Sequence, residues 1–509
     1  MSRHCTTVVQ TCHTDVAVNN ASQLCQSFLQ GGPQAKVLTM KKHAKAHVAA
    51  QGPHCHSSQG GSAAFGKDVT FKIGRQGDYL TSSWFRVEIS SVTAASSLIQ
   101  SGQFLRWTHN LGHNLIESVE HTVSGVPAAT FDEFYMDFFA AFSVPAGKRN
   151  AYDNMIGNLP ELVNPIYDIT SAAAQVLPAA VLNIPLALPY TRDIGVSLPT
   201  GALIYNEVNV SFCLRDWDEL MVVSNATNAQ IGTLNANSSR RVTSSDVATP
   251  PTIKSMQLWG TYVVASSDER KRMGKTPRDM IWEIIQTSSD TSVSSVTGNT
   301  MAYLRYSHAV KALFFAFQNN SLVGERSNYT SRGALTYNVS GLTSTEFPAP
   351  NAFDPVSDAS LKYEGADRLH EMPVDYFSMV QPYYYANSIP TVTGYHLFSF
   401  SHNIVSTESL GCVDFGKLTN VSMEVNLSDD AVLALSGAVI PTAKLPFVDE
   451  KGVPSALPPG YISLGLTTSV INGDATKFNA VKQTFDFRNT CLAHTVVRVI
   501  GGGLGFPIF

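Results

Sequence analysis

Residues 182–215 read LNIPLALPYTRDIGVSLPTGALIYNEVNVSFCLR. Near the end of this stretch, every second residue is apolar: Val208, Val210, Phe212 and Leu214. Successive side chains of a β-strand point to opposite faces, so a period of two predicts a strand that turns one face to a core. Residues 208–214 therefore predict a half-buried strand of an antiparallel sheet.

The same alternation recurs in short pieces through both halves of the chain. It appears at residues 69–73 and 85–89, and again at 313–317, 421–427 and 495–499. Clusters of Gly, Pro, Asn and Ser separate these pieces, as turns separate the strands of β-sandwiches. The sequence predicts an all-β protein with few short helices in its loops.

The length of the chain and its polar stretches predict two domains. At 509 residues the chain is too long for one typical core. Residues 224–251 are polar and end in a Pro pair, which favours a linker between a first sandwich at 65–223 and a second at 252–509. Residues 1–64 precede the first sandwich, and we expect them to form an N-terminal arm. A second polar stretch, 319–345, is interpreted as a surface loop of the second domain.

Composition limits the function classes. Charged residues make up only 15% of the chain and the net charge is −5, so the chain lacks the positive field of a protein that coats nucleic acid. Sparse charge suits burial against other copies, because interface cores are depleted of charge. Seven unevenly spaced cysteines indicate reduced thiols. Neither a signal peptide nor a run of about 20 apolar residues is found, which argues against secretion and membrane spanning.

Several short blocks occur in a fixed order along the chain. They are Arg75-x-Gly77-Asp78, Trp107 with LGHNLI at 111–116, MIG at 155–157, IPL at 184–186, HAVKALFFAFQNN at 308–320, and YFSMVQPYYYANSIPTVTG at 376–394. In this order the blocks resemble the major capsid proteins of the nucleocytoplasmic large DNA viruses. Each block is short, but together they span about residues 28–420. Residues 406–420 depart from the family pattern.

This resemblance implies a fold and an assembly. The fold is a double jelly roll, two eight-stranded antiparallel β-sandwiches in tandem. Three chains form a homotrimer, the pseudo-hexagonal capsomer of an icosahedral shell assembled in the host cytoplasm. Its partners are neighbouring capsomers, minor capsid proteins and the surface of an inner membrane, with no direct contact to nucleic acid. The resemblance implies no enzymatic activity, no catalytic residues and no cofactor.

A basic cluster in the N-terminal arm is the candidate binding site. It consists of Lys36, Lys41, Lys42, His43 and Lys45. Such a cluster suits contact with an acidic inner capsid partner or with anionic lipid headgroups. The alternative, a solvated strand or helix end, stays open. The resemblance places this arm at the base of the capsomer.

Two other sets of residues suggest chemistry. The N-terminal Cys and His residues, among them Cys5, Cys12, His43, His47 and Cys55, fit no closed zinc module, so no metal is predicted. The polar set His113, Glu120, Asp132, Glu133 and Asp137 lacks a nucleophile elbow, a phosphate loop or a metalloprotease helix. His113 among apolar neighbours is interpreted as a hydrogen-bonded core residue. The aromatic residues at 131–142 are interpreted as core or trimer interface.

Two alternatives from other classes remain at this stage. One is a β-sandwich minor capsid or attachment protein that binds host glycans. The other is a tandem β-sandwich enzyme acting on polysaccharide, for which the required pair of carboxylates cannot be identified from spacing.

Overall fold

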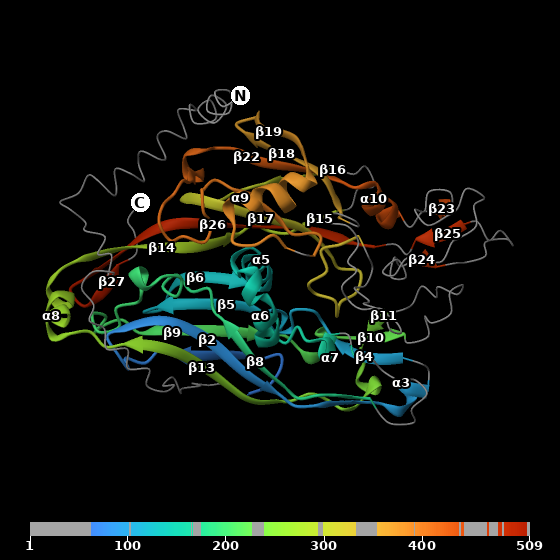
Figure 1. Cartoon of the computed structure of the whole chain (residues 1–509), viewed down its shortest axis with the longest axis horizontal. Coiled ribbons are helices and arrows are strands. Elements are labelled where there is room, and N and C mark those ends of the chain that lie inside the picture. Colours follow the sequence, from blue (N-terminus) through green and yellow to red (C-terminus); the bar gives the residue numbers. More distant parts are fainter. Residues whose placement is uncertain are drawn as a thin grey trace.

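Most regular structure in the computed structural model is β-sheet. The structure describes residues 63–100, 103–163, 165, 175–225, 239–293, 299–331, 354–390, 392–436, 439–441, 466–467, 477–480 and 483–505. Four main sheets stack in layers, with β13, β2 and β8 at the bottom of Figure 1 and β16, β22, β18 and β19 at the top. The layers form two sandwiches, which confirms the predicted double jelly roll.

The first sandwich pairs a four-stranded sheet with a longer, interrupted one. The four strands, in order, are β1 (Asp68–Lys72), β9 (Val208–Leu214), β5 (Ile116–Val123) and β6 (Val126–Asp132). The facing strands are β13 (Ile253–Val263), β2 (Tyr79–Ile89) and β8 (Ala180–Pro185), continued by β12 (Val247–Thr249), β3 (Val92–Ala94) and β7 (Val176–Leu177). At one end β11 (Ser239–Arg241), β10 (Met221–Asn225) and β4 (Gln103–Trp107) form a third sheet.

The alternation at 208–214 is confirmed as the inward face of β9. Val210 and Phe212 are fully buried, while the residues between them are half-buried. The Phe212 ring stacks 4.2 Å from that of Phe85 on the facing sheet and lies edge-on to Phe71 on β1. Such aromatic pairs add about 1 kcal/mol beyond the area that they bury. The core of the first sandwich therefore lies between these two sheets.

The second sandwich also consists of two antiparallel sheets. One contains β14 (Arg278–Thr287), β26 (Phe485–Ile500), β17 (Ala309–Asn319) and β20 (His396–Ser399), with the short strands β15 (Thr291–Ser292), β21 (Val413–Asp414) and β27 (Gly503–Gly505). The other contains β16 (Asn299–Tyr303), β22 (Val421–Leu427), β18 (Val356–Tyr363) and β19 (Ala366–Pro373). A small sheet is formed by β23 (Val439–Pro441), β25 (Lys477–Ala480) and β24 (Leu466–Thr467).

Strand β17 is buried on both faces. Leu313, Phe315 and Phe317 belong to the core of the second sandwich. Ala312, Phe314 and Ala316 face the other way and belong to the core that includes the first sandwich. A strand covered on both sides has no solvent-facing positions to carry polar residues, which explains the unbroken apolar run ALFFAF.

Helices fill the loops between strands. The longest in the described ranges is α5 (Glu133–Ser143), capped by Asp132, whose side chain accepts a hydrogen bond from Tyr135 N at 2.9 Å. The same ranges also contain α3 (Ser96–Gln100), α4 (Leu111–Leu115), α6 (Arg149–Ile156), α7 (Pro160–Val163), α8 (Ser267–Lys275), α9 (Gln381–Tyr385) and α10 (Asp429–Ser436). Helix α8 is capped by Ser266, whose side chain accepts a hydrogen bond from Glu269 N at 3.4 Å.

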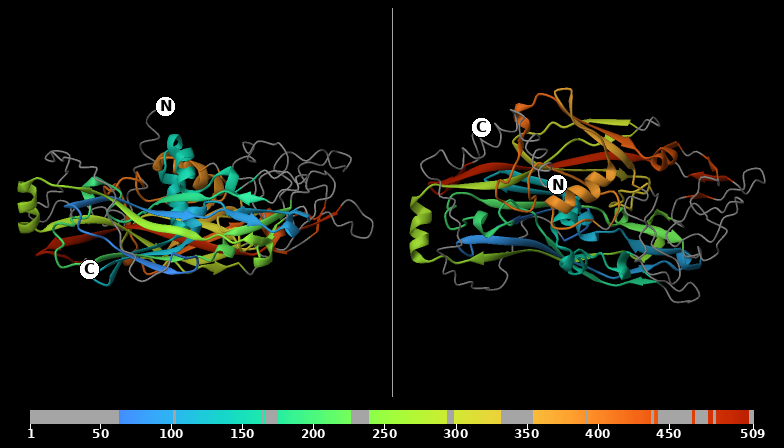
Figure 2. Two further views of the ribbon diagram at one scale, coloured as in Figure 1. Left: turned by 90° about the horizontal axis from the view of Figure 1, so that it is seen from below. Right: turned by 45° about the horizontal axis from the view of Figure 1, so that its top comes forward.

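The aromatic residues at 131–142 are core, as one of the two interpretations had it. Helix α5 lies between the sandwiches, where Phe142 stacks on Phe314 of β17 with ring centroids 5.8 Å apart. Its C-terminal end meets the segment after α9, because Asn387 N donates to Phe142 O at 3.1 Å. Helices α5, α6 and α9 project from the same side of an otherwise flat molecule (Figure 2). The two sandwiches thus share one packed interface.

The strand pairing corrects the predicted domain limits. In the described part of the proposed linker at 224–251, β11 pairs with β10 and β12 pairs with β3, both in the first half. Strand β13 pairs with β2 along its length, so residues 253–263 also belong to the first sandwich. The sequence signal is weak here because β13 is mostly half-buried and does not alternate clearly. The chain passes from one sandwich to the other through α8.

The prediction of a surface loop at 319–345 is wrong for residues 324–331, whereas Asn320, Ser321 and Val323 are exposed. Asn328, Tyr329 and Glu325 are at most 2% exposed. These residues run along the first half, where buried polar side chains satisfy their hydrogen bonds. Polar composition here reflects a buried polar interface rather than contact with water.

Candidate functional site: the polar junction between the sandwiches

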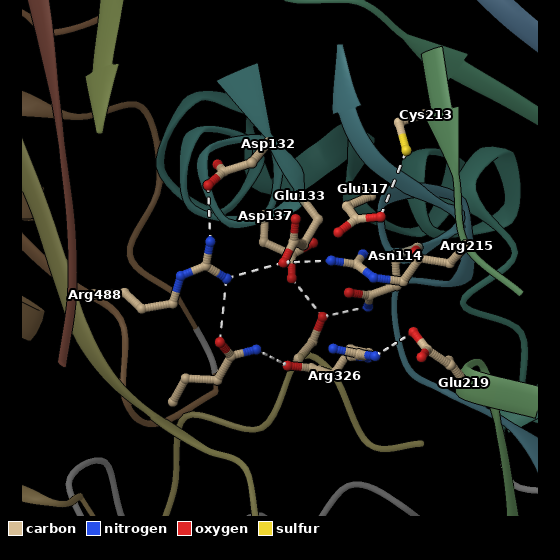
Figure 3. A network of polar contacts seen from close by, with 12 residues as sticks. Asn114, Glu117, Asp132, Glu133, Asp137, Cys213, Arg215, Glu219, Arg326 and Arg488 are labelled. Atoms are coloured by element: carbon tan, nitrogen blue, oxygen red, sulfur yellow. Dashed lines mark hydrogen bonds and ion pairs between the residues drawn. The ribbon is translucent and has the colours of Figure 1, made fainter. Parts of the chain in front are cut away.

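The two sandwiches are joined by a network of buried charges (Figure 3). Its centre is Glu133, at the start of α5. The carboxylate of Glu133 lies 2.9 Å from Arg488 Nη1 on β26 and 3.0 Å from Arg215 Nη2, directly after β9. One carboxylate is therefore shared by a cation from each half of the molecule.

The carboxylate of Asp132 extends this network. Arg488 Nη2 donates to Asp132 at 2.8 Å and Arg488 Nη1 donates to Gln318 Oε1 at 3.1 Å. The guanidinium of Arg488 also lies over the Phe134 ring, 5.0 Å from its centroid. A planar, always charged guanidinium suits such multidentate contacts better than an ammonium does.

The surroundings separate the pKa values of these neighbouring carboxylates. Burial alone would raise the pKa of Glu133, but Arg488 and Arg215 outweigh burial and hold the pKa below its ordinary value. Burial and the adjacent Glu133 charge raise the pKa of Asp132 to about 6, against the opposing effect of Arg488. The carboxylates of Glu133 and Asp132 raise the pKa of Arg488 despite its burial. The Glu133–Arg488 pair thus stays ionised.

A second group surrounds Asp137, one helical turn after Glu133. Its carboxylate accepts from His113 Nδ1 and from the hydroxyl of Ser327. His113 Nε2 lies 2.7 Å from the hydroxyl of Tyr152, and His113 is 1% exposed. The prediction that His113 is a hydrogen-bonded core residue is confirmed.

Residues 319–331 bind the second sandwich to the first. We call this segment the strap. Glu325 of the strap forms an ion pair with Arg106 on β4 and lies 3.1 Å from His109 Nδ1. Burial opposes ionisation, yet Arg106 and His109 lower the pKa of Glu325 to about 2. Arg326 adds a contact of 2.5 Å to Glu219.

A third buried group joins β17 to the first half. Lys311 Nζ lies 2.6 Å from Glu283 on β14, and Arg192 Nη1 lies 3.2 Å from the same carboxylate. Burial would raise the pKa of Glu283, but Arg192 and Lys311 lower it. The guanidinium of Arg192 also stacks 3.9 Å from the centroid of Phe139 on α5.

A cavity of about 450 Å³ opens beside Arg488 and Glu133. Its lining is dominated by charged side chains from both halves, including Glu117, Arg215, Asp290, Arg326 and Asp486. Among the described residues, no group of three or more His, Cys, Asp or Glu is placed to hold a metal ion. Because its central carboxylates are held by guanidinium groups from both halves, the arrangement holds the two sandwiches together.

The structure places only some of the candidate residues from the sequence analysis at the junction. Asp132, Glu133 and Asp137 come together at the junction, whereas Glu120 lies on β5 outside this network. The arm residues Lys36, Lys41, Lys42, His43 and Lys45, and the N-terminal Cys and His residues, lie outside the described residues.

Sequence reasoning missed Arg215 and Arg488 as the partners of Glu133, and it missed the pair of Arg106 and Glu325. The available signal was a single charge inside an apolar or alternating strand, as for Lys311 in HAVKALFFAF. Lys, Arg and Glu are rarely buried without a partner, so such a charge predicts a buried ion pair but does not name the partner.

The described part of the chain contains no helix long and apolar enough to cross a membrane.

Comparison with family models matches both halves of the chain. Residues 41–265 match the family described as major capsid protein N-terminus. Residues 269–445 match the family described as large eukaryotic DNA virus major capsid protein. The two matches meet at α8, where the chain passes between the sandwiches.

Relatives are found among viral proteins. The major capsid protein of Invertebrate iridescent virus 6 is 35% identical over 493 residues, covering 95% of each chain. That of Tipula iridescent virus is 38% identical over 413 residues, covering 81% of this chain and 87% of the relative. That of Frog virus 3 (isolate Goorha) is 32% identical, covering 94% of each chain.

Solved structures share the fold at lower identity. The PBCV-1 VP54 structure fitted into a reconstruction of the virophage Sputnik has a TM-score of 0.62 at 17% identity, covering 90% of this chain and 97% of that one. The Faustovirus major capsid protein has a TM-score of 0.57 at 10% identity, covering 95% and 98%. With both family models and relatives along nearly its whole length, the chain belongs to the major capsid proteins of large eukaryotic DNA viruses.

Proposed function

We propose that three copies of this chain form a pseudo-hexagonal capsomer, a structural rather than enzymatic unit of an icosahedral shell. The observation that carries the proposal is the pair of sandwiches held together by the buried Glu133–Arg488 junction. Two similar sandwiches per chain give six in a trimer. A six-part ring can tile a flat face, while one chain supplies two adjacent parts.

The finer assignments follow from the same proposal. The N-terminal arm with Lys36, Lys41, Lys42, His43 and Lys45 lies on the inner side of the shell, towards minor capsid proteins or a membrane. Neighbouring capsomers bind one another, and assembly takes place in the host cytoplasm. Direct contact with nucleic acid is not part of the proposal, because the chain has a net charge of −5.

The test is the mass of the recombinant full chain in solution. Size-exclusion chromatography with light scattering should give three times the chain mass of 55.0 kDa, with no dissociation on dilution through the micromolar range. Electron microscopy of the same sample should show particles with six lobes. A monomer at high concentration would overturn the proposal, and a monomer that binds glycans would favour the attachment protein.

A further inference from the structure

One end of the long axis carries an exposed face that the shell proposal does not use. Helix α8 and the β26–β27 hairpin lie together at this end in every view (Figures 1 and 2). The loop at 199–206 lies between them, because Tyr205 N donates to Gly502 O at 3.2 Å and Gly201 approaches the Met273 side chain of α8. We call these three elements, with the 74–78 turn described next, the α8 end.

The Arg75-x-Gly77-Asp78 block builds this end. Arg75 Nη2 donates to the carbonyls of Ile204 and Asn206 at 2.6 and 3.1 Å. Asp78 Oδ2 accepts from Arg270 Nε of α8 at 2.9 Å and from Ala265 N at 2.7 Å. One turn therefore fixes both the 199–206 loop and the start of α8.

Large apolar side chains are exposed on this fixed scaffold. Tyr205 is 80% exposed, Ile204 60% and Ile500 56%. Ile204 and Tyr205 lie on the 199–206 loop and Ile500 ends β26, and the loop and hairpin are tied together because Leu504 N donates to Asn206 Oδ1 at 2.8 Å. Side chains of this kind, held outward at the tips of turns, suit insertion into the interface of a bilayer, where Tyr is enriched.

Cations are exposed at the same end of the molecule, on the 74–78 turn and on α8. Arg75, Lys271, Arg272 and Lys275 are exposed, and within the described residues none forms an ion pair, whereas Arg270 and Arg278 have carboxylate partners. Helix stability accounts for basic residues in the last turn of α8. It does not account for the exposed apolar side chains at the same end, nor for four exposed cations there against one exposed carboxylate of α8, Asp268, on a chain whose net charge is −5.

We propose that the α8 end docks on a membrane surface rich in anionic phospholipid, with Arg75, Lys271, Arg272 and Lys275 bound to headgroups and Ile204, Tyr205 and Ile500 inserted between them. The inference rests on the proposed capsomer, because three such faces on one trimer bind one surface together. Each cation contributes about 1 kcal/mol near an anionic surface, so several are needed for stable docking.

The test is co-sedimentation of the full chain with vesicles of phosphatidylcholine, with and without about 30% phosphatidylserine. The wild type should bind only the anionic vesicles, and binding should fall as salt rises from about 0.1 M to about 0.5 M. The triple variant Lys271→Glu, Arg272→Glu, Lys275→Glu should bind at least about tenfold more weakly. Tyr205→Ser should weaken binding to the anionic vesicles but leave its salt dependence unchanged, because the substitution removes an apolar side chain and no charge.

A matched triple variant controls for net charge. Lys148→Glu, Lys254→Glu and Lys417→Glu reverse three exposed cations outside the α8 end and should leave vesicle binding unchanged. Equal binding by both triple variants, or no binding of wild type to anionic vesicles, overturns the proposal. Binding of polyglutamate instead of vesicles overturns the lipid assignment in favour of an acidic protein.

Light scattering on the same samples separates this inference from the capsomer. If the wild type is a trimer but does not bind anionic vesicles, the membrane-docking proposal is refuted and the capsomer proposal is not. A monomer that binds them refutes the capsomer and removes the shared-surface argument.

Discussion

At the scale of single residues, Glu133 is the side chain on which most of the junction depends. It is 4% exposed and accepts from guanidinium groups of both sandwiches. Removing its charge would leave Arg488 and Arg215 buried with less compensation, which costs more than the original pair contributes.

Glu133→Gln should therefore lower the free energy of unfolding by about 3–5 kcal/mol. Urea denaturation followed by fluorescence measures this change. Glu88→Gln is the matched control, because Glu88 pairs with Arg86 at 2.7 Å on the surface, where such pairs contribute about 0–1 kcal/mol. Equal losses of unfolding free energy in Glu133→Gln and Glu88→Gln would show that the buried junction does not depend on the Glu133 carboxylate.

His121 makes the stability depend on pH. It is fully buried on β5, its Nδ1 lies 3.1 Å from Asn209 O, and its ring faces Tyr190 and Trp282. Burial lowers the pKa of His121 from 6.5 to about 4. The unfolded chain thus takes up a proton first as pH falls. The stabilisation is complete above pH 6.5 and is lost towards pH 4.

Between about pH 7 and about pH 5, the free energy of unfolding should fall by about 2 kcal/mol less in His121→Phe than in wild type, because the variant has no buried imidazole to protonate. Urea denaturation at both pH values gives the difference. His370→Phe changes an exposed histidine and should leave the pH dependence as in wild type. An unchanged slope in His121→Phe would show that other groups, such as His494, account for the acid sensitivity.

At the scale of elements, the strap depends on one close approach of two backbones. A Cβ added at Gly324 would lie 2.2 Å from the carbonyl oxygen of Met221 on β10. Backbone on both sides cannot yield as a flexible side chain can, so the strap needs glycine there.

Gly324→Ala should destabilise the protein by about 1–3 kcal/mol and speed hydrogen exchange at residues 319–331. Gly147→Ala is the control, since a Cβ at Gly147 meets nothing within 4 Å. Unchanged exchange in the strap of Gly324→Ala would contradict its tight docking on β10.

Element by element, the sequence predicts what depends on local periodicity. The alternation at 208–214 and 313–317 correctly placed β9 and the odd-numbered face of β17. Helix α5 was not predicted, because nine of its eleven residues are buried and no solvent-facing polar side marks the helical period. The Glu133–Arg488 and Glu325–Arg106 pairs join residues far apart in the chain, and no local pattern specifies such partners.

At the scale of the whole molecule, one core includes residues of both sandwiches. Trp282, Phe314 and Leu492 of the second sandwich belong to the same buried cluster as Phe85 and Phe212 of the first. Neither sandwich can leave the other without exposing that cluster and the junction charges.

Heating the wild type should therefore give one calorimetric transition, in which both sandwiches unfold together. Its van't Hoff enthalpy should equal its calorimetric enthalpy, as for one cooperative unit. The double variant Glu133→Gln, Glu325→Gln should broaden or split it, because both polar junction points are weakened. Two transitions in the wild type would show that the sandwiches unfold independently.

The double burial of β17 has a consequence for how this shell protein can vary. An enlarged side chain at Phe314 or Ala316 pushes the strand towards Phe315 and Phe317 on its reverse, so neither neighbourhood can change volume alone. Substitutions that β17 tolerates should therefore come in pairs, in which a change of volume on one face is balanced by an opposite change on the other. Single substitutions should be rarer there than on β16, which exposes Met301 and Tyr303 to solvent.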